Sequence, residues 1–288
     1  SVSCKNKITS EERVVSFQSL TQPSSIGRVL DSGFKLFAAS LKPVLVLVVA
    51  VSITSILMQY SMFQLMSPAQ QFTTQEEVTQ YMSGVLPQVL GISLFMTLIM
   101  YIFYNAAIYR IGNVAEGIED DLFESLILGI KKAIPVFIAL ILYSLLVGLG
   151  MLLLIIPGLI LMLTLLFYQI LIVNDDEGVF SSLKTSHRLV WGHYWRTAAV
   201  ITVPLFIIIV FLMIPGIIQG YTEAMNQADV VRQGGMVSSY QQSYGVTDIV
   251  SSLLSSMAMA VLAAVSIVQL NDLKLRKSGS DLEQRMSG

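Results

Sequence analysis

The chain has 288 residues, of which 54% are hydrophobic and only 12% are charged, whereas a typical soluble domain has about 25% charged residues. This leaves too little polar surface to cover a soluble fold, so the soluble globular, disordered and collagenous classes are excluded. The formal net charge is −2, from 17 basic and 19 acidic residues, and no basic excess points to a nucleic-acid partner. The sequence therefore predicts an integral membrane protein.

Long uncharged runs mark the predicted spans, because a charged side chain at the bilayer centre costs about 2.5–3.5 kcal/mol. Five such runs are present, and four of them have room for one span each. The run 133–174 is too long for one span, since roughly 20 residues cross the hydrocarbon core. Near its middle, Pro157-Gly158 is a natural tight turn. We therefore expect six spans, at about 44–65, 86–109, 134–156, 159–174, 197–219 and 249–270.

The distribution of basic residues predicts the orientation of these spans. With six spans, 16 of the 17 Lys and Arg residues fall on one side, and only Arg232 falls on the other. Cytoplasmic segments of membrane proteins carry such an excess, so we expect both termini in the cytoplasm and Pro157-Gly158 at the outer surface. Pro215-Gly216 repeats the turn motif at the equivalent edge of the fifth span.

Each predicted pair of spans follows a segment with helical periodicity, at 26–42, 122–134 and 179–195. In the third segment, basic and small polar side chains such as Lys184 and Arg188 lie opposite an apolar stripe. The stripe consists of Val179, Phe180, Leu183, Val190, Trp191 and Tyr194. This pattern is typical of a short amphipathic helix lying in the membrane interface, and equally of a helix that caps the bundle.

The predicted fold is all-α, with six transmembrane helices as three hairpins, each preceded by a cytoplasmic interfacial amphipathic helix. This unit occurs three times, so we expect an internal repeat. The repeat units are about 24–109, 116–174 and 177–270. Residues 24–270 form one membrane domain, the polar segment 1–23 is expected to be disordered, and 271–288 form a cytoplasmic tail.

Four short stretches carry a resemblance to a known family. They are Ile156-Pro-Gly-Leu-Ile160, Asn174-Asp-Asp-Glu-Gly178, Ser182-Leu-Lys-Thr-Ser-His-Arg-Leu189 and Gly192-His-Tyr-Trp195. This pattern resembles the YciC-like family of uncharacterised bacterial inner-membrane proteins, and the related membrane domain fused to some glycerophosphodiester phosphodiesterases. The resemblance implies a six-helix protein of the bacterial inner membrane without an assigned activity. Because no phosphodiesterase domain is attached here, that activity is not carried over.

Motifs for catalysis, cofactors and metals are absent from the sequence. It holds no His-Glu-x-x-His, P-loop, GxSxG or Cys-x-x-Cys, and His187 and His193 are too far apart in sequence to share a helix face as a ligand pair. Asp175, Asp176 and Glu177 are compatible with a divalent cation, but equally with capping of the following helix. We expect no enzymatic activity, no cofactor and no metal site.

Two groups of residues within the spans stand out. At the cytoplasmic end of the second span, Asn105, Tyr109 and Arg110 form a polar cluster that is either a functional site or a set of interhelical hydrogen bonds with a charge anchor. Small residues recur at every fourth position of the last span, which lets helices approach closely. They are Ser252, Ser256, Ala260 and Ala264, and we expect this stripe to face another helix.

The cytoplasmic segments present a set of basic residues to one leaflet. They are Arg28, Lys35, Lys42, Lys131, Lys132, Lys184, Arg188 and Arg196. Each such charge near an anionic surface contributes about 1 kcal/mol to binding. We expect a non-enzymatic protein that acts through contacts of this surface with anionic lipid headgroups, a protein partner or a second copy of the chain. The alternative is a transporter or permease for a neutral or lipid-like solute.

Overall fold

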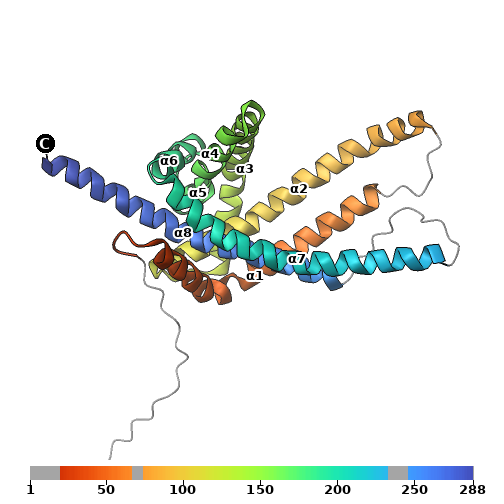
Figure 1. The fold of residues 1–288 in the computed structure, drawn as a ribbon, viewed down its shortest axis with the longest axis horizontal. Helices are drawn as coiled ribbons and strands as arrows, with labels where there is room; N and C mark the ends of the chain where they lie inside the picture. The colour runs from red at the N-terminus through yellow and green to blue at the C-terminus, as the bar shows by residue number, and fades with distance from the viewer. Residues whose placement is uncertain (1–19, 67–73, 233–245, 288) are drawn as a thin grey trace, which may run out of the picture.

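The computed structural model describes residues 20–66, 74–232 and 246–287, and all regular structure in these ranges is helical. The predicted all-α class is therefore confirmed in this part of the chain. The helices are α1 (Ile26–Met66), α2 (Gln75–Glu116), α3 (Leu122–Leu153), α4 (Ile155–Thr164), α5 (Tyr168–Asn174), α6 (Val179–Trp191), α7 (Tyr194–Arg232) and α8 (Val246–Ser287). Figure 1 shows that α2, α7 and the second part of α1 extend to one side, away from α6, whereas the C-terminal part of α8 extends in the opposite direction.

Six helical segments in the described ranges are long and apolar enough to cross a membrane, the number predicted from the uncharged runs. They are 26–65, 75–116, 122–153, 155–174, 194–222 and 246–279. The fourth combines α4 and α5, which are separated by a short irregular stretch. Local signals set some ends: Thr74 and Glu77 form a capping box before α2, and Gly117 ends α2 with φ 72.

Neither proline-glycine motif forms the tight turn that the sequence predicted. The break between α3 and α4 falls at Leu154, and Pro157 lies in the first turn of α4, where a missing N–H leaves no hydrogen bond unmade. Gly158 instead allows close approach, because a Cβ there would lie 2.7 Å from the Met151 backbone nitrogen. Pro215-Gly216 forms no turn, since α7 continues through it.

Two of the expected amphipathic helices are not separate elements. Segment 26–42 is the first part of α1, which contains Pro43, and segment 122–134 is the first part of α3, which contains Pro135. A proline removes one backbone hydrogen bond and can bend a helix without ending it. Figure 1 shows the red first part of α1 and its orange second part running in different directions. Only α6 is a separate helix.

The two ends of the described chain pack side by side, because α1 lies along α8. Gly33 of α1 meets Val265 of α8 so closely that an added Cβ would lie 2.7 Å from Cγ2 and 2.9 Å from Cα of Val265. Farther along the pair, the Ser52 hydroxyl donates a hydrogen bond to the Ser256 hydroxyl (2.9 Å), and the Ser252 hydroxyl donates to the Ser52 carbonyl (3.1 Å). All four residues of the small-residue stripe are buried.

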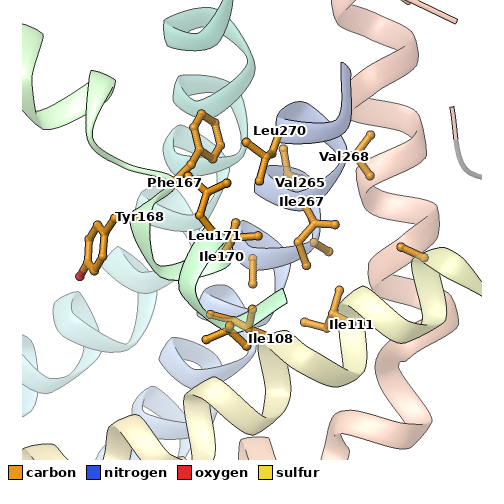
Figure 2. Close-up of a cluster of buried hydrophobic side chains, with 14 of the residues drawn as sticks. Ile108, Ile111, Phe167, Tyr168, Ile170, Leu171, Val265, Ile267, Val268 and Leu270 are labelled. Carbon is orange, nitrogen blue, oxygen red and sulfur yellow. The ribbon is translucent and has the colours of Figure 1, made fainter. Parts of the chain in front are cut away.

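The short helix α5 lies at the centre of the core. Phe167, Leu171 and Ile172 are fully buried, and α5 contacts α2, α3 and α6. Figure 2 shows Phe167 and Leu171 near Leu270 of α8, with Ile108 of α2 on the other side of the cluster. The buried core is therefore centred on α5, which lies between α2 and α8 (Figure 2).

Replacing Gly33 with alanine is expected to destabilise the protein by about 1–3 kcal/mol, the usual cost of overpacking. Gly27→Ala is the matched control, because Gly27 lies in the same helix with no heavy atom within 4 Å of the added Cβ. The control should be neutral or slightly stabilising, since alanine favours helix over glycine by about 1 kcal/mol. Thermal unfolding of both variants in one detergent measures the difference, and equal melting temperatures would contradict the close α1–α8 contact.

Candidate functional site

Helix α6 has one face toward the bundle and one face outward. Its buried residues are Ser182, Leu183, Ser186, Leu189 and Val190, which recur with helical spacing. Ser186 holds this face in place at the break between α4 and α5: its hydroxyl donates to the Thr164 carbonyl (2.7 Å) and accepts from the Phe167 N–H (3.1 Å). A small hydroxyl at the break satisfies two backbone groups that helix ends leave without partners.

The outer face of α6 combines aromatic and basic side chains. Phe180 is 76% exposed and Trp191 is 63% exposed, and Lys184 and Arg188 are exposed beside them. We call these four residues the α6 outer face. The expected single apolar stripe is wrong in this respect: Leu183 and Val190 face the bundle, whereas Phe180 and Trp191 share the exposed face with the cations. The bundle takes up only part of the apolar surface of the helix.

The aromatic character of this region continues into the start of α7. Trp195 is 83% exposed, and its ring meets that of Tyr194 edge to face, with centroids 5.4 Å apart. The His187 ring lies against the Trp191 ring at 5.1 Å. The chain contains only two tryptophans, and both are exposed here. Tryptophan is enriched at membrane–water interfaces because its ring is apolar and its N–H is polar.

Six of the eight basic residues selected from the sequence are exposed, and two are partly buried in ion pairs. The exposed ones are Arg28, Lys35, Lys42, Lys131, Lys184 and Arg188. Lys35 pairs with Asp31 one turn away at 2.6 Å, with both side chains about 60% exposed. Lys132 pairs with Asp176, and Arg196 pairs with Asp272. These last two cations are therefore engaged within the protein.

The acidic loop before α6 connects helices. Asp176, with φ 56, pairs with Lys132 of α3, and this hydrogen bond and positive charge lower the pKa of its carboxyl below the usual value. Asp175 pairs with Lys274 of α8 at 2.5 Å. The N-cap of α6 is Gly178, without a side-chain cap hydrogen bond, so the expected capping role is wrong. Within the described ranges, no group of three or more His, Cys, Asp or Glu side chains is placed to hold a metal ion.

A buried carboxylate in α8 joins three segments of the chain. Asp272 is fully buried and accepts hydrogen bonds from Arg196 (2.9 Å), from Arg276 (2.8 Å) and from the Ser24 N–H (2.8 Å). Both arginines also donate to the Ser24 carbonyl, at 2.6 and 2.7 Å. We call these four residues the Asp272 cluster. Burial, and then the charges of Arg276 and Arg196, lower the pKa of the neighbouring His193.

The Asp272 cluster was not predicted from the sequence, because Asp272 lies just beyond the last predicted span, at the start of the expected tail. The spacing of Asp272 and Arg276, four residues apart on one helix, was a signal for a local ion pair. The pairing with Arg196 and Ser24 spans 76 and 248 residues of sequence, and no local pattern reports contacts at such separations. The tail residues to Arg276 are therefore part of the folded bundle.

The expected intramembrane polar cluster does not converge on one point. Asn105 is fully buried and accepts a hydrogen bond from Nε2 of Gln169 on α5 at 3.0 Å. Arg110 instead pairs with Asp120 beyond the end of α2, at 3.5 Å, with side chains 11% and 6% exposed. Tyr109 is partly buried against the core. These residues thus serve separate interhelical and loop contacts, and the amide pair of Asn105 and Gln169 lies between α2 and α5.

Replacing Asp272 with asparagine is expected to destabilise the protein by about 3–5 kcal/mol, because two partly buried arginines lose their counter-charge. The control is Asp31→Asn, which breaks an exposed ion pair with Lys35 and should cost less than about 1 kcal/mol. Thermal unfolding of the full chain in detergent measures both variants. If both variants lost a similarly small amount of stability, the Asp272 cluster would not hold the segments together.

Comparisons with known proteins identify one family. The family described as an uncharacterised protein family, UPF0259, matches residues 33–228. A UPF0259 membrane protein of Pectobacterium carotovorum subsp. carotovorum (strain PC1) is 36% identical over 75 residues, which cover 26% of this chain and 30% of that protein. No solved structure matches significantly. Because the family match covers more than half of this chain, the chain belongs to the UPF0259 family.

Proposed function

We propose that this protein is a non-enzymatic, multi-pass protein of the bacterial inner membrane whose cytoplasmic side gathers anionic lipid headgroups. The observation that carries this proposal is the α6 outer face, where Phe180 and Trp191 stand exposed beside Lys184 and Arg188. A helix with this mixture lies in the membrane interface, with its aromatic rings at the level of the headgroups and its cations next to the phosphates. Both termini are then cytoplasmic.

The first parts of α1 and α3 support the same arrangement. Arg28, Lys35 and Lys42 are exposed on α1, as are Phe34 on α1 and Phe123 on α3. Lys131 is exposed on α3. In the proposed arrangement, each predicted pair of spans follows a segment that presents cations and apolar side chains together, and three such segments are what the predicted repeat requires. The cations add their attraction to anionic lipid within a Debye length of the surface.

A protein partner or a second copy of the chain is the other occupant that this surface fits. A lipid surface is favoured because the exposed aromatic and basic residues extend over α1, α3, α6 and α7, whereas the centre of a protein interface is depleted of charge. The aromatic side chains also include both tryptophans of the chain. These features together describe contact with a bilayer surface more closely than contact with one protein.

A permease for a neutral or lipid-like solute is the second candidate. One observation favours it, a cavity of about 330 Å³ among the spans, which is within the size range of small-molecule sites. Saturable solute flux in reconstituted vesicles that is lost in Asn105→Ala would support the permease. Retention of anionic lipid through α6 would support the lipid surface.

Neutralising Lys184 and Arg188 together, as Lys184→Gln with Arg188→Gln, is expected to weaken binding of phosphatidylglycerol about thirtyfold. This estimate follows from about 1 kcal/mol for each basic group. Native mass spectrometry of the protein released from nanodiscs counts the bound lipid. The wild-type count should fall as salt is raised.

The control for this experiment is Arg232→Gln, which removes a basic charge at the opposite end of α7 from Arg196. It should leave the phosphatidylglycerol count unchanged. If the double variant retains as much phosphatidylglycerol as the wild type while its melting temperature is unchanged, the proposed lipid surface is wrong.

A further inference from the structure

The cavity among the spans is a site that the basic surface does not use. It has a volume of about 330 Å³ and lies among α1, α2, α3, α5 and α8. Apolar side chains and methionines form most of its wall. Its polar lining residues are Gln169, the tyrosines Tyr101, Tyr104, Tyr143 and Tyr168, and the serines Ser55, Ser255, Ser256 and Ser266. The cavity therefore offers an apolar space with hydrogen-bonding groups from each of the five helices around it.

The charge of the wall limits what this cavity can hold. No Asp, Glu, Lys, Arg or His side chain is among the residues that line it in the described part of the chain. An ion placed among the spans without a counter-charge is strongly disfavoured. A phosphate or ammonium headgroup therefore does not fit, whereas an uncharged molecule with hydroxyl or carbonyl groups does.

Hydrogen-bonding capacity remains available next to the wall. Gln169 lines the cavity and donates to the Asn105 carbonyl oxygen at 3.0 Å. Asn105 is fully buried, and its own Nδ2 has no hydrogen-bond partner within the described ranges, which is unusual for a buried polar group. On α5, Tyr168 points away from the cluster around Leu171 and Leu270 (Figure 2). A buried polar group next to the wall thus retains hydrogen-bonding capacity.

The exposed lining residues indicate where the cavity opens. Met259 of α8 is 45% exposed, and Ser255, one turn earlier, is also exposed. Both lie within the membrane-spanning segment 246–279. At that depth the surroundings of the bundle are lipid chains, so the opening faces the bilayer and the molecules available to it are those dissolved in the membrane.

We propose that this cavity binds one uncharged lipid, whose hydroxyl or carbonyl groups meet Tyr101, Tyr104 and Gln169 and whose chain extends past Met259 into the bilayer. The tyrosine hydroxyls can both donate and accept hydrogen bonds, and the amide adds a donor and an acceptor. The site is separate from the α6 outer face, and neither requires the other.

A photoactivatable diacylglycerol tests this site in the full-length protein, reconstituted in phosphatidylcholine vesicles. Peptide mass spectrometry should locate saturable crosslinks on α2 and α8 around Tyr104 and Met259, and excess unlabelled diacylglycerol should reduce them at least tenfold. A photoactivatable phosphatidylglycerol should give no saturable crosslink there, because the wall has no counter-charge for its phosphate.

Variants of the wall provide the controls. Ala263→Trp fills the cavity, since Ala263 lines it and is buried, and should reduce the saturable crosslink at least tenfold. Ala258→Trp places the same side chain at a half-buried position of α8 outside the lining and should leave it unchanged. Tyr104→Phe removes only a hydroxyl and should weaken binding about fivefold, the ratio for one hydrogen bond.

The outcomes separate this proposal from the lipid surface on α6. Lys184→Gln with Arg188→Gln should leave the diacylglycerol crosslink unchanged even where it removes phosphatidylglycerol. Crosslinking that does not saturate, that is insensitive to both Ala263→Trp and Tyr104→Phe, or that occurs equally with phosphatidylglycerol would overturn the proposal.

Discussion

The ion pairs of the buried Asp272 carboxylate with Arg196 and Arg276 hold together segments that are far apart in the sequence. The carboxylate has no exposed surface and is neutralised by Arg196 and Arg276, which also bind the Ser24 carbonyl. A carboxylate in this environment is tolerated only when its partners and hydrogen bonds are complete. The cluster therefore holds the residues just before α1, the start of α7 and the C-terminal part of α8 together. This arrangement keeps Arg196 within the protein, whereas Lys184 and Arg188 face outward.

Within the spans, close backbone approach and short polar contacts take the place of ion pairs. Lipid removes the hydrophobic drive for helix association, so van der Waals packing and hydrogen bonds hold helices together. Ser52 against Ser256 satisfies this requirement between α1 and α8, and Gly33 in the first part of α1 packs closely against Val265 as well. The same pairing closes the bundle by joining its first and last helices. The cavity lies beside this closure, and four tyrosines from α2, α3 and α5 form part of its wall.

The number of spans was predictable because charge is costly in the bilayer, so uncharged runs report the spans directly. The end of α3 could not be predicted, because Leu154 is indistinguishable from its apolar neighbours. Pro157 is also as suitable for a first helical turn as for a loop. For α6, periodicity identified an amphipathic helix but did not show which arc meets the bundle. Contact with the α4–α5 break selects the arc containing Ser186, and Phe180 and Trp191 are left outside.

The proposed position of the α6 outer face among lipid headgroups can be tested by intrinsic fluorescence without any substitution. Trp191 and Trp195 are the two tryptophans of the chain, and both are exposed, Trp191 on this face and Trp195 at the start of α7. Lipids carrying nitroxide quenchers at different depths report where the indole rings lie. We expect the strongest quenching by a label near the headgroup, and little quenching by aqueous iodide. Strong quenching by iodide together with none by lipid labels at any depth would contradict this position.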